Sequence, residues 1–248
     1  MPDRTLVWDG CLNVRDLGGH PTEDGSVTRY GAVVRADSVR ELSDAGWAAL
    51  DEYGVSRIVD LRFHDELAAD PPRELDVEVV HVPVFPHPDT GAWEEIDRLS
   101  AAAPDDATAT RDVYLTLLGL LPERFAAAVE AVAAAPEGVV VVHCTAGKDR
   151  TGLVTALLLR LAGVGVPAVA ADYAVSAENL RERSRPWIEE AETEEELRRR
   201  RRIAATPAEA MVGVLEELQR RHGGVAAYLR GGGASDDVLE RARARLRS

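Results

Sequence analysis

Residues 143–152 read His-Cys-Thr-Ala-Gly-Lys-Asp-Arg-Thr-Gly and contain a nucleophile, a permanent cation and a glycine. Five residues separate Cys144 from Arg150, which lets the backbone curl around a tetrahedral dianion so that its amide groups converge on the oxygens. The planar guanidinium of Arg150 can hold two of these oxygens while charge redistributes during a reaction. The segment therefore predicts a phosphate-binding loop with Cys144 as a nucleophile. The predicted phosphate-binding residues are Thr145, Ala146, Gly147, Lys148, Asp149 and Arg150.

A buried strand and a helix are expected to position this loop. Residues 139–142 are four valines that follow a glycine, which is typical of a buried parallel strand, and residues 151–161 have the length and apolar character of a helix. Cys144 then lies at a helix N-terminus, where the helix dipole, the loop amides and Arg150 favour its thiolate. His143 is expected to orient the loop, and the Thr151 hydroxyl to donate to the sulfur when it leaves.

Other phosphate and metal chemistry does not fit these residues. A nucleotide-binding loop would need Ser or Thr after Gly147-Lys148, where Asp149 stands, and a glycine at the position of Val142. The six histidines show no metal-ligand spacing, so neither a metal nor a cofactor is expected. The plain alternative is a glycine turn between a strand and a helix, with Cys144 as a small buried residue.

The segment resembles the signature of cysteine-dependent protein tyrosine phosphatases, and more narrowly that of a bacterial atypical group with Lys-Asp before the arginine. Three other segments fit this group: residues 13–19 (NVRDLGG), residues 59–62 (VDLR) followed by Glu66, and residues 171–173 (ADY). The resemblance implies an enzyme that hydrolyses phosphotyrosine, and in some members phosphoserine, phosphothreonine or phosphoinositides, through a cysteinyl phosphate. The implied partner is a phosphorylated protein or a phosphoinositide. Two alternatives from other classes are a phospho-ligand binding module without turnover and a sulfur transferase.

The mechanism that the resemblance implies needs a general acid, for which two aspartates compete. Asp89 ends a proline-stiffened loop after a predicted strand, and Asp149 lies on the rim of the phosphate-binding loop. Asp65 is a third and more distant candidate. The acid must come within hydrogen-bond reach of the leaving oxygen, so the sequence leaves the choice open.

Lys148 is the only lysine of the chain. It is predicted either to bind a second phosphate or to pair with a neighbouring carboxylate, and the alternative is a solvated lysine on the rim. Asn13, Arg15 and Asp16 are expected to brace the loop by hydrogen bonds, as are Asp60, Arg62 and Glu66, which lie at the carboxyl end of a strand.

Strand and helix patterns alternate along residues 1–248, which we interpret as one domain. The predicted strands are residues 30–35, 55–61, 78–84 and 139–142, and a helix over residues 43–53 begins at a Ser N-cap. This pattern predicts an α/β fold with a central, mainly parallel twisted sheet flanked by helices, as in the cysteine phosphatases. Residues 101–110 are expected to form a loop, residues 111–135 two helices around Pro122, and residues 206–248 further helices that complete the fold.

A helical lid or insertion is the prediction for residues 177–205. Within it, glutamates precede five consecutive arginines, residues 198–202, at a four-residue spacing that is typical of a solvated helix. The alternative is a basic patch that attracts inositol phosphates or an anionic membrane surface.

Charge and composition bear on the partner of the protein, its disulfide bonds and its location. The formal net charge of −14 argues against nucleic acid as a partner. Two cysteines, Cys11 and Cys144, provide no disulfide framework, although a reversible disulfide between them is an alternative. Neither a signal peptide nor a stretch of membrane-spanning length is visible, so a cytoplasmic location is expected.

Overall fold

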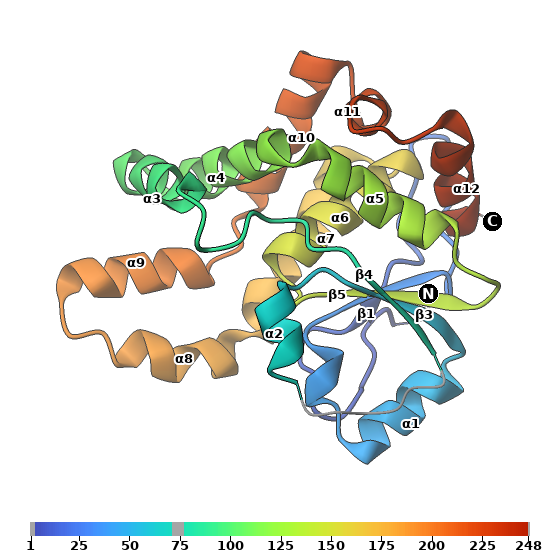
Figure 1. Cartoon of the computed structure of the whole chain (residues 1–248), viewed down its shortest axis with the longest axis horizontal. Coiled ribbons are helices and arrows are strands. Elements are labelled where there is room, and N and C mark those ends of the chain that lie inside the picture. Colours follow the sequence, from blue (N-terminus) through green and yellow to red (C-terminus); the bar gives the residue numbers. More distant parts are fainter. Residues whose placement is uncertain (1–2, 71–76, 248) are drawn as a thin grey trace.

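The computed structural model describes residues 3–70 and 77–247, and its centre is a five-stranded sheet with the strand order β1-β2-β5-β3-β4 (Figure 1). β1 pairs antiparallel with β2, and the other three pairings are parallel. The predicted α/β fold with a mainly parallel sheet is therefore confirmed. The strands are β1 (Arg15–Asp16), β2 (Val33–Ala36), β3 (Val55–Asp60), β4 (Glu78–His81) and β5 (Val139–His143).

β5 lies at the centre of the sheet, and its valines pack into the apolar clusters on both faces. Successive side chains of a strand point to opposite faces, and Val140 and Val142 enter one apolar cluster while Val139 and Val141 enter another. All four are buried. The strand that precedes Cys144 is therefore held by apolar packing on both sides.

Helices cover the two faces of the sheet unequally. The first cluster lies under α4 to α7 and α10 to α12, whereas the second lies under α1 and the N-terminal segment (Figure 1). α10 packs on α4 and α7, and α12 packs on α5 and α6. The helices are a 3₁₀ turn (Val39–Glu41), α1 (Asp44–Glu52), α2 (His64–Ala68), α3 (Ala92–Ala102), α4 (Asp106–Leu120), α5 (Pro122–Ala133), α6 (Asp149–Leu161), α7 (Val166–Asn179), α8 (Arg181–Glu189), α9 (Glu194–Ala204), α10 (Ala208–His222), α11 (Val225–Gly231) and α12 (Asp236–Leu246).

The predicted Ser N-cap of α1 is confirmed, and α12 begins at a cap of the same kind. The Ser43 side chain accepts from Gly46 N at the start of α1, and the Ser235 side chain accepts from Val238 N at the start of α12. Pro122 is the first residue of α5, where its missing N–H costs nothing. The arginine-rich segment forms α9, with Thr193 as its N-cap.

The predicted loop over residues 101–110 is wrong. α3 continues to Ala102 and α4 begins at Asp106, so only a short connection remains. The Asp105 side chain accepts from Thr108 N and caps α4, and the small residues that follow continue the helix. The strand ends also differ from prediction: β2 begins at Val33 and β4 ends at His81.

α8 and α9 form a hairpin that extends beyond the carboxyl ends of the strands, on the left of Figure 1. Arg202 of α9 pairs with Asp106 at 2.8 Å and donates to the carbonyl of Ser100, which ties the hairpin to α3 and α4. Among the described residues, no helix is both long and apolar enough to cross a membrane.

Candidate active site

Residues 144–150 connect β5 to α6 at the carboxyl edge of the parallel strands. Cys144 is 2 % exposed, and α6 begins at Asp149, so the cysteine lies between the strand end and the helix start, as predicted. Cys144 and Cys11 are both free thiols. The thiol of Cys11 donates to Ser38 O at 3.3 Å, and burial raises its pKa far above the usual value, so it stays protonated.

Three consecutive carbonyl groups of the loop are held from outside. Thr145 O accepts from Ser38 N at 3.1 Å, and the side-chain amide of Asn13 donates to Ala146 O at 3.0 Å and to Gly147 O at 3.1 Å. Because the N–H and C=O of a peptide unit point in opposite directions, anchoring these carbonyls outward turns the amides toward the interior of the loop. This is the arrangement that a tetrahedral anion needs.

Gly147 is required at its position. Its φ of +63° lies in the left-handed region, which glycine adopts at little cost. A Cβ atom there would approach the carbonyl oxygen of Ala36 to 2.4 Å. The close contact with the end of β2 therefore depends on the absence of a side chain.

A buried cluster of charges supports the loop from beneath. Arg35 donates from Nη2 to Gly147 O at 2.7 Å and from Nη1 to Asp172 at 2.8 Å, and Arg15 donates to Asp172 Oδ1 at 3.1 Å. The three residues are almost fully buried. Burial alone would raise the pKa of Asp172, but the charges of Arg15 and Arg35 hold that pKa well below its usual range. We call Arg15, Arg35 and Asp172 the buried arginine cluster.

The buried arginine cluster carries more positive than negative charge. The guanidinium groups of Arg15 and Arg35 face the single carboxylate of Asp172. Burial and the neighbouring charge of Arg35 lower the pKa of Arg15 to about 10, which leaves Arg15 charged at neutral pH. Arg4 and His20 also contact Asp172. A low-dielectric environment strengthens such fields. The excess positive charge therefore favours an anion in the loop above.

Arg150 is held by a bidentate ion pair with Glu66 of α2. Its Nη1 and Nη2 atoms lie 2.5 Å and 3.0 Å from the two carboxylate oxygens, and the Thr145 hydroxyl also donates to Glu66. Burial alone would raise the pKa of Glu66, but these donors and Phe63 N lower it to about 2. The guanidinium is thus fixed in orientation before any ligand arrives.

His143 connects the loop to the strand beside it. Its Nε2 lies 3.5 Å from Asp60 Oδ2, and its Nδ1 lies 3.2 Å from Cys144 O. Arg62 pairs with the same carboxylate at 2.8 Å. Burial opposes ionisation of Asp60, but His143 and Arg62 outweigh it and keep the pKa far below the usual value. Arg62 therefore reaches the loop through Asp60 and His143.

The two candidate general acids have different surroundings. Asp149 Oδ1 accepts from the Tyr114 hydroxyl at 2.6 Å, and its side chain is 41 % exposed. Asp89 is 88 % exposed and pairs with His87 at 3.1 Å. Asp65 lies near the same histidine, at 3.5 Å. Only Asp149 belongs to the loop itself.

Lys148 is not the solvated rim lysine of the alternative interpretation. Lys148 is 7 % exposed, and its Nζ donates to the carbonyl of Ile203 near the end of α9. Nζ also lies 3.6 Å from Asp149 Oδ1. The lysine therefore joins the loop to the α8–α9 hairpin.

A cavity of about 380 Å³ opens beside Lys148 and Asp149. We call it the side cavity. Apolar and aromatic residues of the loop after β4, α3 and α4 form its wall, and Arg199 and Arg202 of α9 form part of its rim. The wall includes Phe85, Trp93, Ile96, Val113, Tyr114 and Leu117.

Asp16 was expected to brace the loop, but its hydrogen bonds go to other residues. Its carboxylate accepts from Gly18 N, Gly31 N and the Tyr53 hydroxyl, so it stabilises the N-terminal turn before β2. Asn13 does brace the loop, and Arg15 acts through the buried arginine cluster. Sequence reasoning missed Arg35, whose single available signal was its place at a strand end. The described residues contain no group of three or more His, Cys, Asp or Glu side chains that could hold a metal.

Comparison with known proteins identifies the family of this chain. A family model described as the tyrosine phosphatase family matches residues 6–248. The chain is 29 % identical to a tyrosine-protein phosphatase of Nostoc commune, over 87 % of this chain and 74 % of that protein. It is 28 % identical to the triple specificity protein phosphatase PtpB of Mycobacterium tuberculosis, over 94 % of this chain and 96 % of that protein. The chain therefore belongs to the tyrosine phosphatase family and is a protein tyrosine phosphatase.

Proposed function

We propose that Cys144 is the nucleophile and that hydrolysis proceeds through a cysteinyl phosphate. The observation that carries this proposal is the outward anchoring of the carbonyls of residues 145–147 around a buried cysteine. The inward amides and Arg150 bind the phosphoryl oxygens, and Glu66 keeps the guanidinium in place. Stabilisation of charge that develops in the transition state is the largest contribution to be expected of such a loop.

The reaction takes two steps in this proposal. The Cys144 thiolate attacks phosphorus in line, the P–O bond to the leaving group breaks, and a general acid protonates the departing oxygen. The same group then removes a proton from water, whose oxygen attacks phosphorus, and the S–P bond breaks to give phosphate and the thiolate. The Thr151 hydroxyl is buried and has no hydrogen-bond partner among the described residues, which supports its assignment as the donor to the departing sulfur.

Asp149 is our assignment for the general acid. It borders both the loop and the side cavity, whereas Asp89 is not among the residues that line this cavity. Burial and the charge of Asp149 raise the pKa of Tyr114 well above its usual value, so Tyr114 remains a donor to Oδ1. Lys148 also faces Oδ1, which leaves Oδ2 as the atom that carries the transferred proton.

The residues that line the side cavity are an argument for both aryl phosphates and inositol phosphates as substrates. Its aromatic wall suits the ring of phosphotyrosine, and Arg199 and Arg202 at its rim suit further phosphates of a phosphoinositide. We also propose that the α8–α9 hairpin, within residues 177–205 of one domain, covers this cavity as a lid and brings its arginines near an anionic membrane surface. The triple specificity named for the mycobacterial relative is consistent with this breadth; phosphoserine and phosphothreonine belong to the same proposal.

One experiment separates the enzyme from a binding module of the same fold. Wild type and Cys144→Ser are compared with a phosphotyrosine peptide, a phosphoserine peptide and a phosphoinositide in micelles, by release of phosphate and by binding. We expect the serine variant to bind these ligands and to release no phosphate. Turnover that persists in Cys144→Ser contradicts the role of the thiolate, and binding without turnover by wild type favours the binding module.

A further inference from the structure

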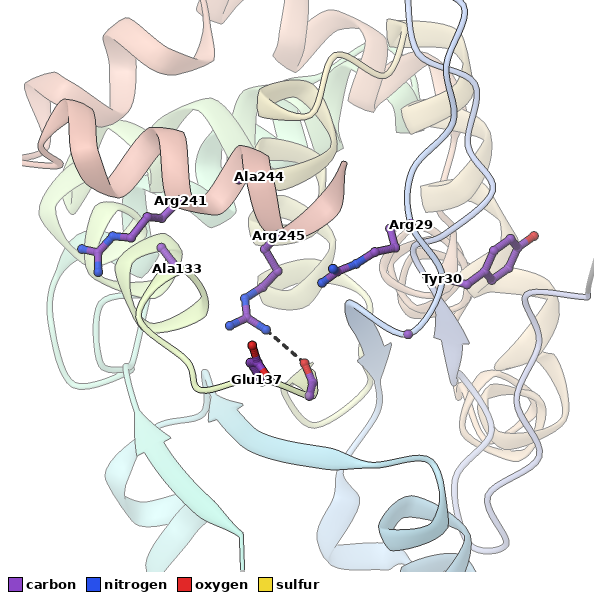
Figure 2. Close-up of a pocket in the computed structure, with 9 residues that line it drawn as sticks. Arg29, Tyr30, Ala133, Glu137, Arg241, Ala244 and Arg245 are labelled. Carbon is purple, nitrogen blue, oxygen red and sulfur yellow. Dashed lines mark hydrogen bonds between the residues drawn. The ribbon is translucent and has the colours of Figure 1, made fainter. Parts of the chain in front are cut away.

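Figure 2 shows a second cavity, whose lining residue Gly138 comes directly before β5, whereas Cys144 comes directly after that strand. Its volume is about 590 Å³, and it lies between the segment before β2, the α5–β5 connection and α12. Gly138 at its floor is six residues from Cys144, which is roughly 20 Å along a strand at about 3.3 Å per residue. It is therefore separate from the loop and from the side cavity.

Basic side chains dominate this second cavity. Its lining includes three arginines, Arg29, Arg241 and Arg245, and one carboxylate, Glu137. In Figure 2 the side chains of Arg29 and Arg245 extend into the same space from different segments, while Arg241 points away from them. Arg241 pairs with Asp237 at 2.9 Å.

Arg245 and Arg29 have no carboxylate partner among residues 3–70 and 77–247. The guanidinium of Arg245 donates to three neutral carbonyls, Gly138 O at 3.0 Å, Pro136 O at 2.9 Å and Ala135 O. These bonds fix the position of the guanidinium, and their acceptors carry no formal negative charge. In a chain with a formal net charge of −14, two such cations in one cavity are not a consequence of overall composition.

The charges of this cavity also act on each other. Burial, followed by the positive charges of Arg29 and Arg57, lowers the pKa of Arg245. Glu78 pairs with Arg57 at 2.6 Å and offsets the charge of that arginine. The repulsion that a bound anion can relieve is therefore the repulsion between Arg29 and Arg245. Neutralising a partly buried like-charge pair stabilises the folded state that contains it.

We propose that this cavity binds a small phosphate-bearing anion, with Arg29 and Arg245 as the groups that hold it. Two guanidinium groups match the oxygen geometry of phosphate and diphosphate, and the volume lies in the range of small-molecule sites. Arg245 is already oriented by the α5–β5 carbonyls, so binding needs to order only the exposed side chain of Arg29. The anion would link the segment before β2 to α12.

The experiment must first block the loop of residues 144–150, because phosphate is expected to bind there as well under the proposed function. Cys144 is first alkylated with iodoacetamide, with which Cys11 should react poorly because burial raises the pKa of its thiol. The alkylated protein is then titrated by calorimetry with inorganic phosphate, inorganic pyrophosphate and a sugar bisphosphate. The three probes distinguish a free anion from an organic phosphate.

We expect one saturable site for at least one probe, weakened by about tenfold or more in Arg29→Met, as for the loss of a charged hydrogen-bond donor. Arg98→Met, which removes an exposed arginine of α3 that does not line this cavity, should bind as wild type does. Arg245→Met should bind weakly as well, with circular dichroism as a check of its fold. The proposal is overturned if no probe saturates the alkylated protein, or if Arg29→Met and Arg98→Met lose affinity equally.

Discussion

Arg35 donates to the carbonyl of Gly147 at 2.7 Å from one amino group and to Asp172 at 2.8 Å from the other. Gly147 lies in the loop of residues 144–150. Asp172 lies on α7 and also accepts a hydrogen bond from Arg15. The guanidinium thus links the buried Asp172 of α7 to a carbonyl of the loop. It also places a positive charge next to the loop that we propose binds phosphate.

Replacing Arg35 by lysine should impair the loop more than the fold. An ammonium group reaches Gly147 or Asp172 but does not span both as the planar guanidinium does. We expect kcat/KM to fall by about 10²-fold, the effect of a slight misplacement of reacting groups. The rate of Cys144 alkylation by iodoacetamide should fall, because the loop amides and the charge beside the sulfur are displaced. An unchanged alkylation rate with reduced stability would mean that Arg35 has a structural role alone.

Asp149→Asn and Asp89→Asn should differ in their dependence on the leaving group. A nitrophenolate leaves without protonation, whereas an alkoxide requires it. Asp149→Asn should therefore lower kcat/KM, which reports the step that expels the leaving group, by about 10²-fold or more for an alkyl phosphate and much less for 4-nitrophenyl phosphate. Asp89→Asn should behave as wild type with both. The reverse pattern would move the assignment to Asp89.

Arg199 and Arg198 are adjacent exposed arginines of α9 and form a matched pair. Arg199 lines the side cavity, whereas Arg198 does not. Arg199→Gln should weaken turnover of a phosphoinositide, by about tenfold for a lost charged contact to phosphate. Arg198→Gln should leave it unchanged, and neither variant should affect a small aryl phosphate. Equal losses in both variants would indicate general electrostatic attraction rather than a contact in the cavity.

Glu66 should contribute to the acid sensitivity of the fold. Its pKa is about 2 in the folded protein against a usual value of 4.5, so the folded state binds fewer protons than the unfolded state in this window. Its stabilising effect is complete above pH 4.5 and is lost as the pH falls toward about 2. Urea unfolding of wild type and Glu66→Gln at a series of pH values should show a stability difference that narrows on acidification. A constant difference would mean that the Arg150 pair adds nothing to stability.

The parts of this structure that sequence predicts are those fixed by local chemistry. Four successive valines, the Ser43 cap and Pro122 each specify an element with their neighbours alone. The buried arginine cluster was not predictable in this way, because Arg35 and Asp172 are 137 positions apart. The loop prediction for residues 101–110 failed because it depended on local composition alone. Small residues that are common in loops also continue a helix once Asp105 caps its first turn.

The burial of Lys148 depends on a contact that forms only after the chain has folded. Ile203 belongs to an exposed, arginine-rich helix whose sequence indicates solvent on all sides. Its carbonyl nevertheless accepts from the lysine of the loop, 55 positions earlier. Together with the Arg202–Asp106 pair, this contact holds α9 beside the side cavity, which Arg199 and Arg202 line.

Acid quenching during turnover can trap the proposed cysteinyl phosphate. The quenched protein is digested, and the peptide that contains Cys144 is examined by mass spectrometry for a phosphoryl group on sulfur. We expect phosphocysteine at Cys144 in wild type, more of it when Asp149→Asn slows its hydrolysis, and none in Cys144→Ser. Steady phosphate release with no phosphoryl group on Cys144 in either wild type or Asp149→Asn would contradict it.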